Sequence, residues 1–555
     1  MMALAKFLFI PLFGLLLSCE NKNKAPNENQ TNENGSASDQ ILLYGNGSEP
    51  RELDPSLAVG EPEGNILDNL FEGLATLHPQ TLEAQPGMAE SWTVSPDGKT
   101  YTFKIRKDAK WSDGKELTAE DFVWSWTRTL QPITASEYAY QLYYIKNGEA
   151  FNTGKIKDPK QLGVKALDKY TLEVELVNPT PFFIKLTAFR TLFPIPRHVI
   201  EKFPGHEWTR DKNMVSNGPY KIMEWKLNKD IKVVQNEYYW DKNSVRLKGI
   251  VFYPTENSDT EEKMFLSGKL HVTNTVPSMK IPYYEKESKK LGDQSIYSAT
   301  PEMATYFYWI NVKKKPMDDK RVRRALALTI DRTEIVRDIL HAGQIPTGSF
   351  TPPVNGYTHE GTLPLTVTPA AIAEAKKLLT EAGYPDGKGL PKIEIHYNTL
   401  EAHKKIAVAI QSMWKKNLGI DVGLFNQEWK VYLDTQRKFE FQVSRGGWVA
   451  DYPDPNTFLD LFVTNGGNNH TQWSNPAYDK LIREAAQTVE EKKRFEFFHK
   501  AESILLDELP MIPIYFYTRT RLITPKFRYV DNGKFVRWVP NVTNHNVFKN
   551  FAFVP

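Results

Sequence analysis

The segment from Arg445 to Asp451 places two oppositely charged residues at the two ends of a stretch that contains Gly-Gly-Trp. A guanidinium group matches a carboxylate with two parallel hydrogen bonds, so Arg445 is suited to hold a carboxylate. Gly446 and Gly447 allow another backbone to approach closely, which makes Asp451 the strongest candidate for a binding role. A purely structural alternative remains for Arg445, in which it only braces Asp451.

Cys19 is the single cysteine of the 555-residue chain, so no intrachain disulfide can form. It follows an apolar run, 7–17, that is too short to cross roughly 30 Å of bilayer hydrocarbon. This run is typical of a signal peptide, 1–18, and Ser18 before Cys19 is similar to the lipobox at which bacterial lipoproteins are lipidated. We therefore expect an extracytoplasmic protein attached to a membrane through lipidated Cys19. A free thiol after an ordinary signal peptide is the alternative.

Other chemistries lack their usual residues. The eleven histidines show no His-Glu-x-x-His pattern, which argues against a dedicated metal site. The sequence contains no nucleophile elbow, phosphate loop or dinucleotide fingerprint, so no cofactor and no enzymatic activity are expected. Carboxylates far apart in sequence leave a hidden catalytic pair open. Since the net charge is only +3 and no basic arm is present, nucleic acid is not an expected partner.

The elements that must position these residues alternate between short strands and longer helices. At roughly one domain per 150 residues, the length predicts two to four domains, and the interleaving predicts an α/β or α+β fold. Residues 19–40 contain almost no apolar side chains and predict a flexible tether. Period-two alternation predicts strands at 101–106, 172–176 and 393–397, while capping signals predict helices starting near Thr118, at Pro369 and near His403.

Residues 87–126 match a known family in a fixed order of short motifs. They read Gly-Met-Ala-Glu-Ser-Trp at 87–92, Ser-Pro-Asp-Gly at 95–98, Trp-Ser-Asp-Gly at 111–114 and Leu-Thr-Ala-Glu-Asp-Phe at 117–122. This stretch resembles the family 5 extracellular solute-binding proteins, which include oligopeptide-, dipeptide- and nickel-binding proteins of ABC importers. The resemblance extends from about Ile41 to the C-terminus.

The segment 445–452 resembles the corresponding stretch of the oligopeptide-binding members, which implies short peptides as ligands. The resemblance implies that Asp451 pairs with the α-ammonium group of a peptide and that Gly447 and Val449 offer backbone groups to it. The remaining implied site residues are Arg445, Arg437 and His403 for the ligand carboxylate, and Trp448, Trp429 and Tyr138 as walls of side-chain pockets. Core packing is the alternative for Trp429 and Tyr138, and a surface position for His403.

Departures from the family pattern concern ligand length. Where some relatives place an arginine or a lysine for the ligand carboxylate, this chain has Gln436 and Leu340. A cysteine pair that some relatives contain is replaced by Val449 and Ala304. The preferred peptide length is therefore expected to differ.

The family implies a two-lobed fold like that of periplasmic binding proteins, with an additional inserted domain and the ligand buried between the lobes. Such a protein acts as a monomer that closes on its ligand and is then recognised by an ABC transporter permease. A dipeptide, a murein peptide, a metal chelate or a sugar are alternative ligands on the same fold, and a surface enzyme or adhesin is the alternative class. We expect lobe I at 41–72, 197–303 and 516–555, the inserted domain at 73–196 and lobe II at 304–515.

Overall fold

The computed structural model describes residues 40–543 and 545–554. The expected signal peptide, Cys19 and all of the tether except Gln40 lie outside the described residues. Gln40 belongs to the folded part, because its side-chain amide donates a hydrogen bond to the carbonyl oxygen of Phe553 at 3.0 Å. No helix within the described ranges has the length and apolar character needed to span a membrane.

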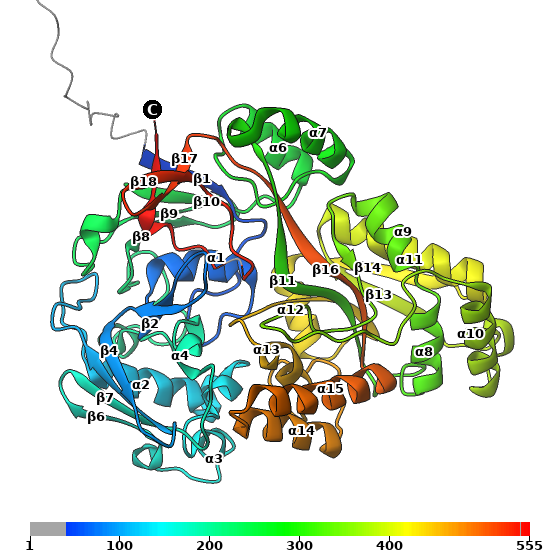
Figure 1. Cartoon of the computed structure of the whole chain (residues 1–555), viewed down its shortest axis with the longest axis horizontal. Coiled ribbons are helices and arrows are strands. Elements are labelled where there is room, and N and C mark those ends of the chain that lie inside the picture. Colours follow the sequence, from blue (N-terminus) through cyan, green and yellow to red (C-terminus); the bar gives the residue numbers. More distant parts are fainter. Residues whose placement is uncertain (1–39, 544, 555) are drawn as a thin grey trace, which may run out of the picture. The chain divides into compact units, whose positions relative to one another are not determined.

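One sheet, which we call the small sheet, has four strands in the order β1–β10–β9–β8 (Figure 1). Strand β1 (Ile41–Gly45) runs parallel to β10 (Gly249–Tyr253), and β9 (Asp230–Gln235) and β8 (Tyr220–Lys226) continue the sheet antiparallel. Helix α1 (Glu61–Leu70) has a proline in its first turn and buries most of its length beneath this sheet. The chain leaves the small sheet after β1 and α1 and returns to it at β8.

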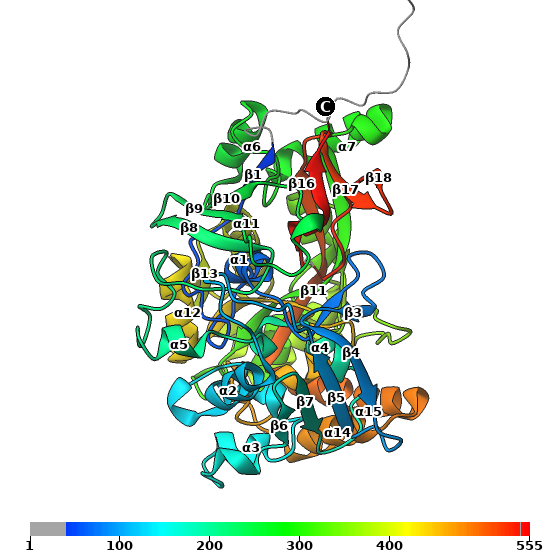
Figure 2. The ribbon, with the colours of Figure 1, turned by 90° about the vertical axis from the view of Figure 1, so that its left-hand side faces the viewer.

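The segment between them forms a separate four-stranded antiparallel sheet, which together with helix α2 (Ala119–Leu130) we call the insert. Figure 2 shows the insert below the small sheet. The carboxylate of Asp121 accepts a hydrogen bond from the backbone N–H of Thr118 at 2.7 Å, which confirms the predicted capping box. The four-stranded sheet of the insert has the order β4 (Ala89–Val94), β5 (Thr100–Ile105), β7 (Thr171–Glu175) and β6 (Val164–Asp168).

The large sheet has six strands, and two of them are long enough to reach the small sheet. Strands β11 (Tyr297–Ile310) and β16 (Met511–Leu522) pair antiparallel along most of their length. At the far end of this ribbon the backbone N–H of Thr273, from the small-sheet side, donates to the carbonyl of Leu522 at 2.9 Å. The large sheet has the order β12 (Ile345–Pro346), β16, β11, β15 (Val443–Val449), β13 (Ile393–Asn398) and β14 (Val422–Gln427).

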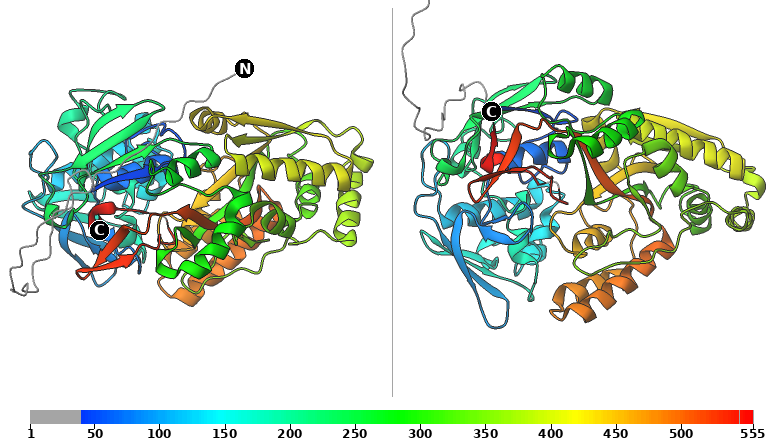
Figure 3. Two further views of the ribbon diagram at one scale, coloured as in Figure 1. Left: turned by 90° about the horizontal axis from the view of Figure 1, so that it is seen from above. Right: turned by 45° about the horizontal axis from the view of Figure 1, so that its top comes forward.

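Helices cover the large sheet, and two of them begin where, or within two residues of where, the capping signals predicted, α10 at Pro369 and α11 at Glu401. The hydroxyl of Thr368 accepts from the backbone N–H of Ala371 at 3.2 Å at the start of one helix, and Gly419, with φ 73°, ends another. Figure 3 shows these helices at the outer edge, away from the small sheet. The helices on this side are α8 (Lys320–Leu328), α9 (Arg332–Glu334), α10 (Pro369–Glu381), α11 (Glu401–Leu418), α12 (Trp429–Arg437), α13 (Asn456–Leu459), α14 (Pro476–Gln487) and α15 (Glu491–Glu508).

The remaining elements complete the small-sheet side and the insert. Strands β17, β18 and β19 form a three-stranded sheet near the C-terminus, and β2 pairs with β3. Both β11 and β16 cross the expected lobe limits at 303 and 516, so those limits remain predictions. These elements are β2 (Ala75–Leu77), β3 (Ala84–Pro86), α3 (Gly148–Asn152), α4 (Phe183–Leu186), α5 (Arg197–Ile200), α6 (Ser258–Leu266), α7 (Ile281–Leu291), β17 (Phe527–Asp531), β18 (Lys534–Arg537) and β19 (Phe551–Phe553).

Candidate functional site

A cavity of about 310 Å³ lies where the small-sheet side, the insert and the large sheet meet. The small-sheet side contributes α1 and the loop after β1, and the large sheet contributes β15, β16 and the starts of α11 and α12. Of the predicted binding residues, the structure places in its wall Asp451, Arg445, Gly447, Trp448, Val449, Tyr138, Trp429 and His403.

Asp451 is buried at the end of the cavity that faces the insert. Its carboxylate accepts hydrogen bonds from the side-chain amide of Gln141 at 2.7 Å and from the hydroxyl of Tyr138 at 3.4 Å. The ring of Tyr138 in turn stacks on Trp448, with centroids 5.9 Å apart. Burial raises the pKa of Asp451 to about 7, although the charge of Arg190 opposes this rise. A cation bound here would therefore favour the ionised carboxylate.

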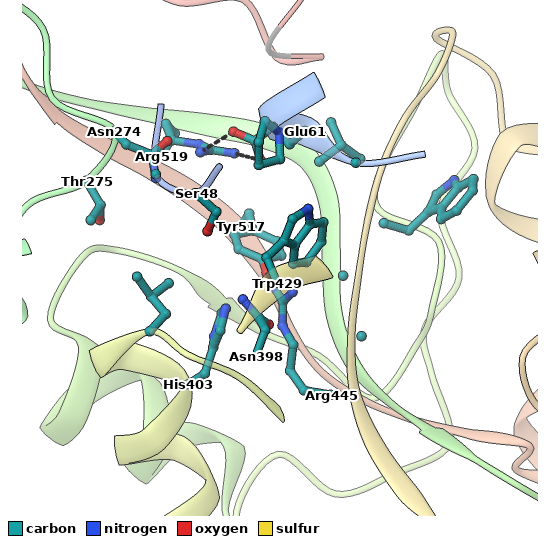
Figure 4. A pocket seen from close by; sticks show the side chains of 18 of the residues that line it. Ser48, Glu61, Asn274, Thr275, Asn398, His403, Trp429, Arg445, Tyr517 and Arg519 are labelled. Carbon is teal, nitrogen blue, oxygen red and sulfur yellow. Dashed lines mark hydrogen bonds and ion pairs between the residues drawn. The ribbon is translucent and has the colours of Figure 1, made fainter. Parts of the chain in front are cut away.

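Arg445 enters the cavity from the large sheet, and Figure 4 shows it beside Tyr517. Its guanidinium donates to the Tyr517 hydroxyl at 2.5 Å and lies 4.9 Å from the ring centroid of Tyr306. Its Nε atom has no hydrogen-bond partner, and no carboxylate of the described residues forms an ion pair with it. The alternative in which Arg445 braces Asp451 is not supported, because the two side chains share no contact. Arg445 thus presents a guanidinium that forms no direct ion pair with a described carboxylate, although its charge helps to lower the pKa of Glu61.

His403 and Asn398 lie beside Arg445 in the same wall (Figure 4). His403 is buried and not a surface residue, and its Nδ1 atom lacks a hydrogen-bond partner, as does the Oδ1 atom of Asn398. Burial, reinforced by the charge of Arg445, holds the pKa of His403 well below its ordinary value. A neutral imidazole with a free nitrogen can still form a hydrogen bond to a ligand.

Strand β15 leaves one of its edges open toward the cavity. The backbone N–H of Ala450 donates to the carbonyl of Met303 at 2.9 Å, and Gly447 lies opposite Tyr306 in the same antiparallel register. Because hydrogen-bonded pairs alternate along such a ladder, the N–H and C=O groups of Gly447 and Val449 point away from β11.

On that opposite edge the parallel partner β13 is registered with β15 only at Val443 and Ser444. The edge beyond Ser444 has no strand partner among the described residues, so an extended chain can pair with it. Val449 itself faces Ala304 across the ladder, which places the two positions of the absent cysteine pair side by side.

Gln436 and Leu340, the two residues that depart from the family pattern, also line the cavity. Gln436 donates its amide to the carbonyl of Arg445 at 3.0 Å and to the hydroxyl of Ser444 at 3.0 Å, so it fixes the β15 backbone and brings no charge. Leu340 adds an apolar surface. Neither position offers a cation to a ligand.

Arg437 was expected to bind the carboxylate of the ligand, but its side chain points away from the cavity. It does not line the cavity but donates through Nε to the carboxylate of Glu137, from the insert, at 3.0 Å. Arg51 of the small-sheet side lies 3.8 Å from the same carboxylate and 3.9 Å from that of Asp434. Arg437 directly follows Gln436, which stands where some relatives have an arginine. One position along a helix turns the side chain by about 100°, so Arg437 points in another direction. Here it joins a rim of ion pairs that connects all three parts.

Sequence reasoning missed several charged residues of the wall. Glu61 and Arg519 form a bidentate ion pair, with bonds of 2.7 and 2.8 Å (Figure 4). Asp68 and Arg190 also line the cavity. They come from segments without a binding motif and far from the 445–451 stretch, so nothing in the sequence connected them with it.

A buried cavity between separate sheets, joined by two long strands and bearing opposite charges toward its interior, is the arrangement of a solute-binding protein. The chain matches the bacterial extracellular solute-binding proteins, family 5 (middle region), over residues 83–470, and it belongs to this family. This confirms the predicted family. Because the members are solute-binding proteins, it also supports the prediction that the protein is not an enzyme.

The relatives include proteins with peptide-binding names. The chain is 40% identical over 503 residues to the periplasmic oligopeptide-binding protein OppA of Salmonella typhimurium, which covers 88% of this chain and 89% of that protein. The structure of Haemophilus influenzae OppA in complex with the peptide RPPGFSPFR matches with a TM-score of 0.87 at 37% identity, covering 93% of this chain and 99% of the other. The predicted fold class is thereby confirmed.

Two structures of one relative identify the conformation. The murein tripeptide-binding protein MppA of Escherichia coli, 38% identical, matches in one structure with a TM-score of 0.86, covering 93% of this chain and 99% of that one. Its unliganded open form, with 93% and 97% covered, gives only 0.62. The described structure therefore differs from the open form of MppA and is close to the peptide-bound OppA structure, as a closed form would be.

We expect protonation of Asp451 to favour the closed form of the ligand-free protein. In the closed form the pKa of Asp451 is about 7, whereas a hydrated carboxyl in an open form has a pKa of about 3.9. At Asp451 the closed form then binds more protons, so this residue should contribute at least about a tenfold rise in the ratio of closed to open protein as the pH falls from 7 to 4, against the opposite effect of buried His403 and His545. Small-angle X-ray scattering measures the ratio of closed to open protein, and Asp451→Asn should lose the part of its pH dependence that comes from Asp451. An equal response of the variant and the wild type would contradict this role of Asp451.

Removal of the rim ion pair should open the protein. Arg437→Met deletes the bond to Glu137, and because the pair is partly exposed the closed fraction should fall only by up to about fivefold. The radius of gyration of the free protein reports this change. Arg483→Met is the matched control, since Arg483 is exposed and forms no ion pair among the described residues. Identical scattering of the two variants would show that the rim pairs do not hold the closed form.

Proposed function

We propose that the protein captures short peptides outside the cytoplasm and delivers them to the permease of an ABC importer. The observation that carries this proposal is the open edge of β15, which lies between the guanidinium of Arg445, without a direct ion pair, and a buried carboxyl at Asp451. A peptide supplies what such a site lacks, namely an extended backbone with a cation at one end and an anion at the other.

The backbone groups of Gly447 and Val449 pair with the ligand as a further strand. A side chain at Gly447 would interfere, because a Cβ atom there would lie 2.9 Å from the Arg445 guanidinium and 3.0 Å from the Tyr517 hydroxyl. Recognition through backbone and termini is independent of the ligand sequence, which supports broad selectivity. Trp448, Trp429 and Tyr138 then form walls of side-chain pockets.

The termini are held by the residues at the two ends of the edge. Asp451 pairs with the α-ammonium group, while Arg445 and the free nitrogen of His403 bind the α-carboxylate. The six residue-to-residue steps of extended chain from Arg445 to Asp451 span at most roughly 20 Å, which suits a peptide of about three to five residues.

A murein peptide is a second candidate ligand. The murein peptide-binding protein MppA of Escherichia coli is 41% identical over 481 residues, which is as high as the identity to OppA. Asp451 suits the free amino terminus of either kind of peptide. Calorimetry with a murein tripeptide beside an unrelated tripeptide decides between them.

Peptide binding through Asp451 is tested by removing either charge of the proposed pair. Asp451→Asn should weaken tripeptide binding about a hundredfold to a thousandfold, because a buried charge without its partner costs roughly 3–5 kcal/mol. Acetylation of the peptide should weaken wild-type binding similarly, and both changes together should cost less than their sum. Calorimetry measures all four affinities; if the variant bound free and acetylated peptides as tightly as the wild type, the proposed role of Asp451 would be wrong.

The lipid anchor at Cys19 is part of the proposal and rests on the lipobox-like sequence alone. Cys19→Ser should leave a precursor that is not lipidated and is released from membranes, because each buried CH₂ of an acyl chain contributes about 0.8 kcal/mol of membrane affinity. Fractionation with metabolic labelling by palmitate detects this change. Normal labelling and membrane retention of the variant would rule out Cys19 as the anchor.

A further inference from the structure

Two oppositely charged residues line the cavity beside Asp451 and have no assigned role. Asp68 comes from α1 and Arg190 from the segment after α4, and their side chains lie 4.0 Å apart from Nη1 to Oδ1. They are only 6% and 8% exposed. The charge of Arg190 also acts on Asp451, so the pair is close to the proposed ammonium site.

The Asp68–Arg190 pair differs from other buried ion pairs of this chain. Arg494 donates two hydrogen bonds to Asp454, at 2.7 and 2.5 Å. Arg519 donates to Glu61 and to Glu302 through bonds of 2.7–3.2 Å. Both cases show the geometry that compensates buried charges when the role is structural.

Asp68 and Arg190 lack such bonds. Within residues 40–543 and 545–554, neither side chain forms a hydrogen bond, and the Nε atom of Arg190 is buried without a partner. The one further ion-pairing contact of Asp68 with a described residue is to His545, at 3.6 Å, and burial lowers the pKa of that histidine. A guanidinium with five N–H donors and a carboxylate with two acceptor oxygens therefore keep their bonding capacity for something inside the cavity.

The surroundings hold Arg190 in this place. A Cβ atom on Gly64 would lie 2.5 Å from its Nη1 atom, so the absence of a side chain at that point of α1 makes room for the guanidinium. The ring of Phe189 lies 4.6 Å from the guanidinium carbon. Confinement of this kind pre-organises the group, which lowers the entropic cost of binding a ligand.

We infer that Asp68 and Arg190 form a subsite for a charged side chain on the first residue of the bound peptide, and that it accepts either sign. An acidic side chain bonds to Arg190 and a basic one to Asp68, while the other member of the pair remains within about 4.0 Å of its partner. The inference rests on the proposed function, because Asp451 must hold the α-ammonium group for the first side chain to lie here.

The test asks whether removing one charge of the pair makes the subsite prefer a peptide whose first side chain carries that same sign of charge. Calorimetry compares Glu-Ala-Ala, Gln-Ala-Ala and Lys-Ala-Ala on the wild type, on Asp68→Asn and on Arg190→Gln. The wild type should bind the glutamate and lysine peptides within about fivefold of each other. Asp68→Asn should favour the glutamate peptide over the lysine peptide by at least about twentyfold, and Arg190→Gln should favour the lysine peptide similarly, since each variant leaves one buried charge in need of a partner.

Two controls separate this outcome from a structural role. Arg437→Gln, at the rim, should change all three affinities by one factor, and charges placed at the third peptide position should produce no exchange of preference. If Asp68→Asn and Arg190→Gln also changed all three affinities by one factor, the subsite would be excluded.

If either variant fails to fold, a measurement on the wild-type protein still tests the inference. Lys-Ala-Ala should bind at least about fivefold more tightly than norleucine-Ala-Ala, because the aliphatic side chain leaves both charges without hydrogen bonds. Equal or tighter binding of the norleucine peptide would overturn the inference. Failure of Ala-Ala-Ala to bind at all would instead refute peptide binding itself, so the two failures are distinguishable.

Discussion

Beyond Arg445, strand β15 uses its backbone on one edge only, and the site is built around the edge that remains. The hydrogen bond from Ala450 to Met303 fixes the register with β11, and that register directs the amides of Gly447 and Val449 into the cavity. A shift by one residue would turn them toward β11 instead and reverse the side chains of the strand. Gln436 supports the same edge by holding the carbonyl of Arg445.

The charged residues around that edge differ in how completely their hydrogen-bonding capacity is used. Glu61, Glu302 and Arg519 satisfy one another and stabilise the wall, whereas Arg445, Asp451 and the Asp68–Arg190 pair retain bonding capacity. Burial of incompletely bonded charge is costly, so the closed and empty protein stores a penalty that a ligand relieves. That penalty favours an open empty protein and a closed loaded one, which is the behaviour expected of a carrier.

Local elements of the fold were predictable, and contacts between distant segments were not. Alternation located β5, β7 and β13, and the Thr118 and Thr368 caps fixed two helix starts, because these signals lie within a few neighbouring residues. Family resemblance supplied most of the wall residues, but Arg437, also named from it, bonds to Glu137 and does not line the cavity. The Asp68–Arg190 pair was missed because it exists only after α1 packs against the insert.

The hydrogen bond between Gln40 and Phe553 joins the first and last parts of the folded chain. The backbone N–H of Lys248 donates to the carbonyl of the same glutamine at 2.8 Å, so three distant segments meet at one point beside β1 (Figure 1). Contacts of such long sequence separation form slowly and only when the whole chain is present. If the chain is exported as proposed, the small-sheet side therefore cannot be completed until the C-terminal residues have left the translocation channel, and the emerging polypeptide must be kept from aggregating until then.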